Sequence, residues 1–125
     1  MNKQLTFLLS LTFLFLFSGS SVVFGDDWND GVIAYIKKDY KEAYKLWLPL
    51  AEQGNAKAQY NLGLMYVNGQ GVPQDYVLAH MWWNLSGSNG YKDAVTNRNI
   101  IEKRMSPSQK EKAQEMARNR KPTSR

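Results

Sequence analysis

The chain contains no cysteine, which limits the ways in which a small domain can be held together. Small domains that work outside the cytoplasm often rely on disulfides, because their cores are small. A disulfide-linked scaffold is excluded here, so packing alone must stabilise the fold, and this favours regular helices with short connections. The length of 125 residues predicts a single domain, and 4 Trp and 7 Tyr supply ample aromatic surface for its core.

Histidine is almost as scarce as cysteine, because His80 is the only one in the chain. Zinc sites combine several Cys and His ligands, so a lone histidine predicts no metal site, and no motif predicts a cofactor. A catalytic general base needs an oriented partner, and the sequence shows none for His80. We therefore expect His80, four residues after Tyr76 on a helix, to be a partly buried packing residue. The chain is predicted not to be an enzyme.

Phenylalanine is absent after residue 24, and all five copies lie in an apolar segment that follows Lys3. A basic start, an apolar run over residues 5–17 and a tail of small residues are typical of a secretory signal peptide. We expect cleavage after Gly25, or alternatively after Ser20, and hence an exported protein that is periplasmic or secreted. The other alternative is an uncleaved membrane anchor, but the apolar run covers about 13 residues and a bilayer requires roughly 20.

Positive charge is concentrated at the C-terminal end of the chain. From Arg98 onward there are nine Lys and Arg against three Glu, whereas acidic residues slightly outnumber basic ones over residues 26–97. Outside the cytoplasm such a segment favours contact with an anionic lipid or an acidic envelope polymer rather than with nucleic acid. The alternative is that these charges only solvate the end of the fold.

The chain repeats itself when it is shifted by 36 residues, and the matches keep their spacing. The matched pairs are Asp39 and Asp75, Tyr40 and Tyr76, Ala43 and Ala79, Trp47 and Trp83, Gly54 and Gly90, Ala58 and Ala94, and Asn61 and Asn97. Each unit is predicted to contain two helices, because apolar residues recur at spacings of three and four within 40–51 and 56–68. Asp75 is the expected N-cap of a helix over 76–88, and Ser106 that of the last helix.

Glycines mark special backbone positions in the second unit. Gly63 lies inside the helix over 56–68, where a glycine costs roughly 1 kcal/mol relative to alanine. We expect a neighbouring helix backbone to cross closely there. Gly69 is predicted to close the helix and Gly71 to permit a positive φ in a turn. A phosphate-binding loop is not favoured, because Val-Pro follows Gly71 where such a loop requires Lys and then Ser or Thr.

Residues 56–90 resemble a Sel1-like repeat, a member of the tetratricopeptide-like helical repeat superfamily. The resemblance rests on Ala58, Gln59, Tyr60, Asn61, Leu62, Gly63, Tyr66, Gly69, Gly71, Val72, Asp75, Ala79, Trp83 and Gly90. Residues 28–54 resemble a preceding unit whose inter-helix loop is five residues shorter, and residues 91–119 resemble capping helices. The resemblance implies an all-α, right-handed α/α solenoid of two to two and a half repeats plus a C-terminal capping helix. This domain would span residues 26–125, after a signal peptide over residues 1–25.

The family binds proteins or peptides on the concave side of the solenoid, which the first helix of each unit lines. This implies a non-enzymatic binding module of the bacterial envelope or of the cell exterior. Asn61 and Asn97 are equivalent, Asp30 is placed at the same point of the first unit, and stacked amides there could hold an extended peptide. A solvated polar face is the alternative. The candidate partner-binding residues are Lys57, Tyr60, Asn61, Leu64, Asn68, Asn97 and Trp82.

Trp82 is included because it aligns with Leu46 and is therefore expected to be partly exposed, and exposed aromatic residues are common binding anchors. Trp82, His80 and the basic C-terminal helix also carry the competing interpretation. In that interpretation the protein is a peptidoglycan-related envelope-polymer binder or a weak hydrolase.

Overall fold

The computed structural model describes residues 27–120, in which all regular structure is helical. The helices, in chain order, are the first helix (residues 27–36), α2 (Tyr40–Glu52), α3 (Ala56–Asn68), α4 (Tyr76–Ser88), α5 (Lys92–Glu102) and α6 (Pro107–Arg120). The predicted helices over 56–68 and 76–88 are confirmed. None of the helices in residues 27–120 combines the length and apolarity needed to cross a membrane. The predicted signal peptide lies outside the described residues.

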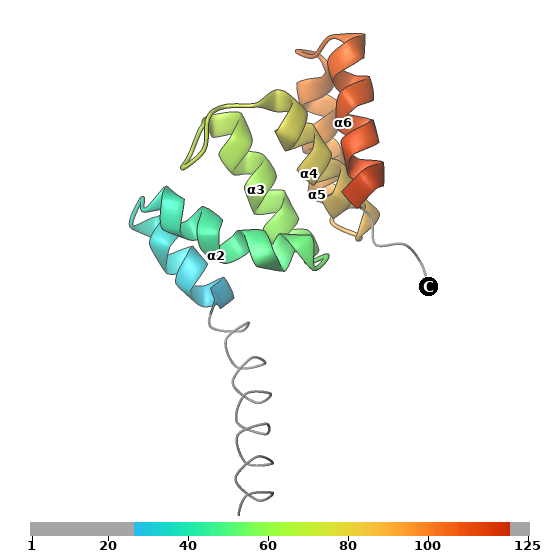
Figure 1. Cartoon of the computed structure of the whole chain (residues 1–125). Coiled ribbons are helices and arrows are strands. Elements are labelled where there is room, and N and C mark those ends of the chain that lie inside the picture. Colours follow the sequence, from blue (N-terminus) through green and yellow to red (C-terminus); the bar gives the residue numbers. More distant parts are fainter. Residues whose placement is uncertain (1–26, 121–125) are drawn as a thin grey trace, which may run out of the picture.

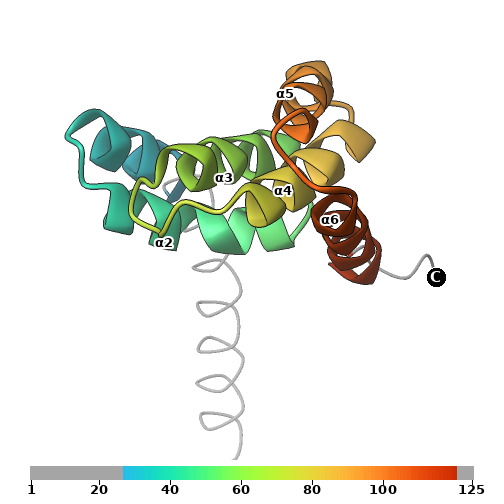
Figure 2. The same cartoon turned by 90° about the horizontal axis from the view of Figure 1, so that it is seen from above.

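The helices stack in chain order to form a short solenoid. α3 packs between α2 and α4, and α5 and α6 both pack on α4 (Figure 1). The first helix, α3 and α5 follow one side of the molecule, while α2, α4 and α6 follow the other (Figure 2). This two-sided arrangement confirms the predicted all-α, tetratricopeptide-like solenoid.

Side chains at the N-termini of successive helices accept hydrogen bonds from otherwise unpaired backbone N–H groups. Asn55 and Asp75 accept bonds of 2.9 and 3.1 Å from the amides of Ala58 and Leu78. Ser106 accepts a bond of 3.1 Å from the Gln109 amide, and the Gln109 side chain accepts one of 2.9 Å from the Ser106 amide. The predicted caps at Asp75 and Ser106 are confirmed, and each such cap contributes about 1 kcal/mol.

A tryptophan ring lies over a glycine in each repeat. The indole Nε1–H of Trp83 donates a 3.0 Å hydrogen bond to the Tyr60 carbonyl, and a Cβ built on Gly63 would lie only 2.2 Å from that nitrogen. Trp47 lies in the same way over Gly31. The expectation that a helix backbone crosses Gly63 is therefore wrong. The missing side chain makes room for the Trp83 indole.

The indole hydrogen bonds also correct the alignment of the first unit. The acceptors are the carbonyls of Trp28 and Tyr60, so the first helices of the two units align with a shift of 32 residues, from 28 to 60. The loop of the first unit is therefore four residues shorter, not five, because the second helices align with a shift of 36. Asn29, and not Asp30, is the residue equivalent to Asn61.

α4 is the central helix of the solenoid and is buried on nearly all sides. Its buried residues are Ala79, His80, Met81, Trp82, Trp83, Leu85 and Ser86. Trp82 is 2% exposed, so the expectation that it is partly exposed is wrong. Leu46, the residue of α2 that aligns with Trp82, is half-buried. Trp82 is buried because α6 packs against α4 and covers the side of α4 that carries it.

The glycine-containing loop between α3 and α4 is a turn that packs on the start of α2. Gly69 ends α3 in the left-handed conformation, with φ of 64°. Gly71 has φ of 73°, and a Cβ on it would lie 2.7 Å from the backbone of Tyr40. Both glycine predictions are confirmed, and the close approach explains why no side chain fits at Gly71.

The indole contact predicts that Gly63→Ala destabilises the fold although alanine is the better helix former. Alanine would stabilise the helix by about 1 kcal/mol through its higher helix propensity. Displacing the Trp83 indole would cost about 1–3 kcal/mol and would also break the hydrogen bond of the indole. We expect a lower urea midpoint for Gly63→Ala and an unchanged midpoint for the control Gln114→Ala, on the exposed face of α6. A midpoint for Gly63→Ala at or above that of the unmodified chain would contradict this packing.

Candidate functional site

A groove lies between the first helix and α3, the first helices of two successive units. Its cavity has a volume of about 460 Å³. The walls are largely apolar, and α2 contributes Trp47. The apolar residues that line the cavity are Trp28, Val32, Tyr35, Ile36, Trp47 and Leu64. A cavity of this size and character accommodates a large apolar side chain of a ligand.

Lys57 supplies the charge of the groove. Among the described residues that line the cavity it is the only charged one. Its Nζ lies 5.2 Å from the centre of the Trp28 ring, which is the distance of a cation–π contact. The ammonium group is thereby held near the apolar wall, where it favours a ligand that places negative charge beside an apolar group.

Two side-chain amides line the groove at equivalent positions. Asn61 comes from α3, and Asn29 comes from the first helix. Sequence reasoning missed Asn29, because it took the loop of the first unit to be five residues shorter and so placed Asp30 opposite Asn61. The signal in the sequence was the Asn-x-Gly pattern of Asn29 and Gly31, which recurs 32 residues later at Asn61 and Gly63.

The other predicted partner-binding residues lie outside this cavity. Tyr60 and Asn97 form a separate pair, in which the Asn97 amide donates a 3.2 Å hydrogen bond to the Tyr60 hydroxyl. The Tyr60 ring also packs on Tyr91, with 4.7 Å between the ring centres. Asn68 is exposed at the end of α3, and Trp82 is buried between α4 and α6. The structure therefore brings Lys57, Asn61 and Leu64 together and separates the remaining four.

His80 has a partner that sequence reasoning missed. Its Nε2 lies 2.8 Å from Oε1 of Glu102, so the pair links α4 to α5. The imidazole is 0% exposed, and its Nδ1 has no hydrogen-bond partner within the described residues. No group of three or more potential metal ligands occurs within residues 27–120. A fully buried imidazole cannot reach a substrate, so the pair serves packing between the two helices.

Burial decides the charge state of His80. Desolvation lowers the pKa of its imidazole below the ordinary value of 6.5, and the Glu102 carboxylate opposes this shift. Arg98 on α5 and Lys110 on α6 also lower the pKa. A second proton on the imidazole would bind Nδ1, which has no hydrogen-bond acceptor within residues 27–120. The neutral imidazole, donating from Nε2 to Glu102, is therefore the form that the fold stabilises.

Comparison with known families assigns the two units. Residues 29–55 and 56–91 each match the Sel1 repeat. The chain belongs to the Sel1 repeat family. Sel1 repeats are protein-interaction modules, and the family is generally non-enzymatic. The groove lies where the two matched repeats of this Sel1 repeat protein meet, since Asn29 comes from the first match and Asn61 from the second.

The His80 pair predicts how the stability of this Sel1 repeat protein depends on pH. The pKa of His80 in the folded protein lies below 6.5, so as the pH falls His80 is protonated in the unfolded chain before it is protonated in the folded protein. The contribution of neutral His80 to the free energy of unfolding is therefore complete above pH 6.5. It declines as the pH falls from 6.5 toward the pKa of His80 in the folded protein. The free energy of unfolding, measured with urea at about pH 7.5 and about pH 5.5, should fall more for the unmodified chain than for His80→Gln. An equal fall in both would show that His80 does not titrate differently on folding.

Proposed function

We propose that this Sel1 repeat protein binds an extended peptide segment of a protein partner in the groove between its first helix and α3. The observation that carries the proposal is the pair of amides, Asn29 and Asn61, at equivalent positions along a cavity with apolar walls. An asparagine amide both donates and accepts, so two of them in register match the donors and acceptors of a peptide backbone.

The apolar walls supply the affinity in this proposal. Trp28 and Leu64 are only partly buried, so a side chain of the partner that enters the groove removes further apolar surface from water. Lys57 at the same cavity pairs with a carboxylate of the partner. The groove is short, since it spans two repeats, and a modest affinity follows from its size.

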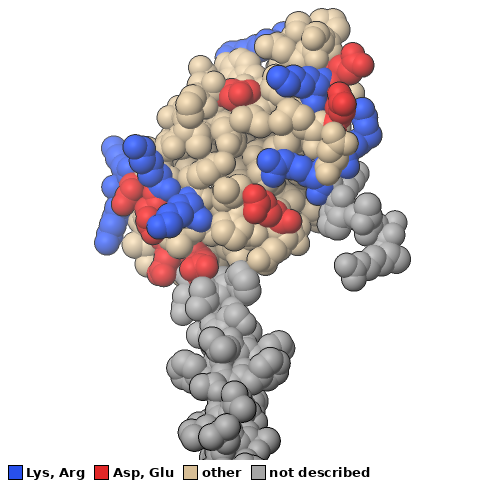
Figure 3. Space-filling model, viewed as in Figure 1, with Lys and Arg blue, Asp and Glu red and all other residues tan. Residues whose placement is uncertain are grey.

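The competing function, an envelope-polymer binder or hydrolase, has less support. This function requires Trp82 as an exposed aromatic platform and His80 as a catalytic base. Both side chains are buried. Most basic residues of the C-terminal segment are exposed, but on the face shown in Figure 3 they alternate with acidic residues. A mixed surface of this kind favours solvation over binding to a polymer of a single charge.

The groove proposal predicts that peptide binding depends on the two amides. Peptides selected from a random library against the protein should bind Asn29→Ala/Asn61→Ala about 30-fold more weakly, because two hydrogen bonds of about 1 kcal/mol each are lost. Isothermal titration calorimetry measures the affinity. The matched control is Asn119→Ala, an exposed asparagine on α6. Failure to select any peptide, or equal affinity for the double variant, would contradict the proposal.

We also propose that the protein acts in the bacterial envelope or outside the cell. The support is the apolar run over residues 5–17, which follows Lys3 and precedes a tail of small residues. Intact mass spectrometry of the protein from its own cells should give a chain that begins at Asp26. A full-length chain with Met1 or Asn2 in the cytoplasm would contradict export, and the same chain in the membrane fraction would indicate an anchor.

A further inference from the structure

A second cavity lies on the opposite side of the solenoid, where α2, α4 and α6 end. Its volume is about 570 Å³, and its lining is about evenly polar and apolar, whereas that of the groove is largely apolar. Trp82 and Leu85 of α4 lie at this cavity together with the last residues of α2. The proposed peptide-binding function does not use it, and it contains none of the residues of the groove.

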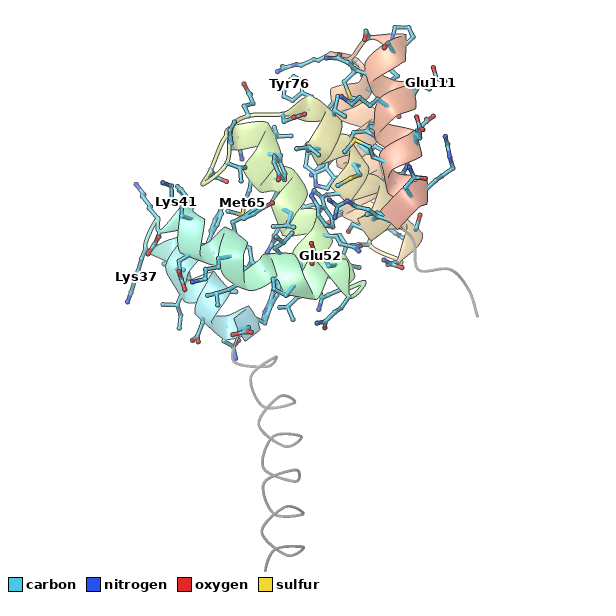
Figure 4. The ribbon with its side chains drawn as sticks, viewed as in Figure 1. Lys37, Lys41, Glu52, Met65, Tyr76 and Glu111 are labelled. Carbon is cyan, nitrogen blue, oxygen red and sulfur yellow. The ribbon has the colours of Figure 1, made fainter. Side chains whose placement is uncertain are left out.

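Two helix C-termini converge on this cavity. α2 ends there at Glu52 and α4 at Ser88, and neither helix has a basic residue in its last turn. The carbonyl groups of their last turns are largely paired, since those of Leu50, Ala51, Ser86 and Gly87 accept backbone hydrogen bonds. The Glu52 carboxylate, at the labelled end of α2 in Figure 4, supplies a full negative charge. Among the described residues that line the cavity, Glu52 is therefore the source of negative charge.

The ends of the two helices are fixed relative to each other by Gln59. This side chain is 3% exposed, and its Nε2 donates a 2.9 Å hydrogen bond to the Ala51 carbonyl near the end of α2. Its Oε1 accepts a 3.0 Å bond from the side-chain amide of Asn89, directly after α4. The ends of both helices are thus held in place by Gln59.

A cation of the chain itself already occupies part of the cavity. The Arg120 guanidinium carbon lies 4.9 Å from the centre of the Trp82 ring, and Nη1 lies 4.0 Å from Oε1 of Glu52. Among the described residues that line the cavity, Arg120 is the only cation. Its side chain is 44% exposed, and an ion pair of 4.0 Å between exposed groups is weak. The position of Arg120 therefore shows that a guanidinium fits this part of the cavity, although its own contacts there are weak.

We propose that this cavity is a binding site for an organic cation, a guanidinium or primary ammonium group on an alkyl chain, and that Arg120 is its intramolecular competitor. Arg120 covers the Trp82 ring in this structure, so the ring becomes available to the cation when Arg120 moves away. The Glu52 carboxylate then neutralises the cation, and the alkyl chain fills the remaining volume. The cation comes either from a free small molecule or from an arginine or lysine of a protein. Anions are repelled by the same groups.

The test uses Nα-acetyl-arginine amide as the probe and its uncharged counterpart Nα-acetyl-citrulline amide as the matched ligand control. The Nε1–H resonance of Trp82, assigned with Trp82→Phe, reports binding by NMR. We expect a saturable shift with the arginine probe and none with the citrulline probe. Arg120→Ala should bind about tenfold more tightly, because the competitor is removed. The control Arg118→Ala, an exposed arginine on the same helix, should leave the affinity unchanged.

Glu52→Gln tests the charge of the site. In the Arg120→Ala background it should weaken binding of the arginine probe about threefold, the range expected for an exposed ion pair. An alanine peptide with a single central arginine separates the two sources: tighter binding than the free probe indicates a protein ligand, and equal binding indicates a small cation. No saturable shift in Arg120→Ala, an equal response to citrulline, or no effect of Glu52→Gln would overturn the proposal.

Discussion

The contact of an indole with a glycine sets the geometry of this solenoid. In each repeat a tryptophan of the second helix lies where the first helix lacks a side chain, and its N–H donates to a backbone carbonyl one turn earlier. The ring fixes both the distance between the two helices and their register, because the hydrogen bond has only one acceptor. Trp47 and Trp83 therefore give the two repeats the same internal arrangement although their loops differ in length.

The two surfaces of the protein follow from that arrangement. Since the first helices have the same register, Asn29 and Asn61 take equivalent places along one groove. Since the second helices have the same length from tryptophan to C-terminus, α2 and α4 end beside each other on the opposite side. One surface is then apolar with amides and a lysine, and the other carries Glu52 together with Arg120, which covers the buried Trp82. Each is suited to a different ligand chemistry.

The sequence predicted the features that depend on local residues and missed those that depend on contacts between distant helices. The bounds of α3 and α4 followed from Asp75 and the apolar spacing, which act within one turn. The burial of Trp82 depends on α6, and no repeat spacing reveals that contact. Glu102 lies 22 residues from His80, so only the packing of α5 on α4 brings them together. Asn29 was missed because a loop difference of five residues placed Asp30 opposite Asn61, whereas the indole hydrogen bonds show a difference of four.

The central claim is that a partner peptide lies across both repeats and is held by both amides. The most direct measurement is the set of intermolecular NOEs between the backbone N–H groups of a selected peptide and the side-chain amides of the protein. The account predicts NOEs to Asn29 and Asn61 on the same bound peptide, with its apolar side chain near Leu64. NOEs only to residues of α2, α4 or α6, with none to the two asparagines, would contradict it.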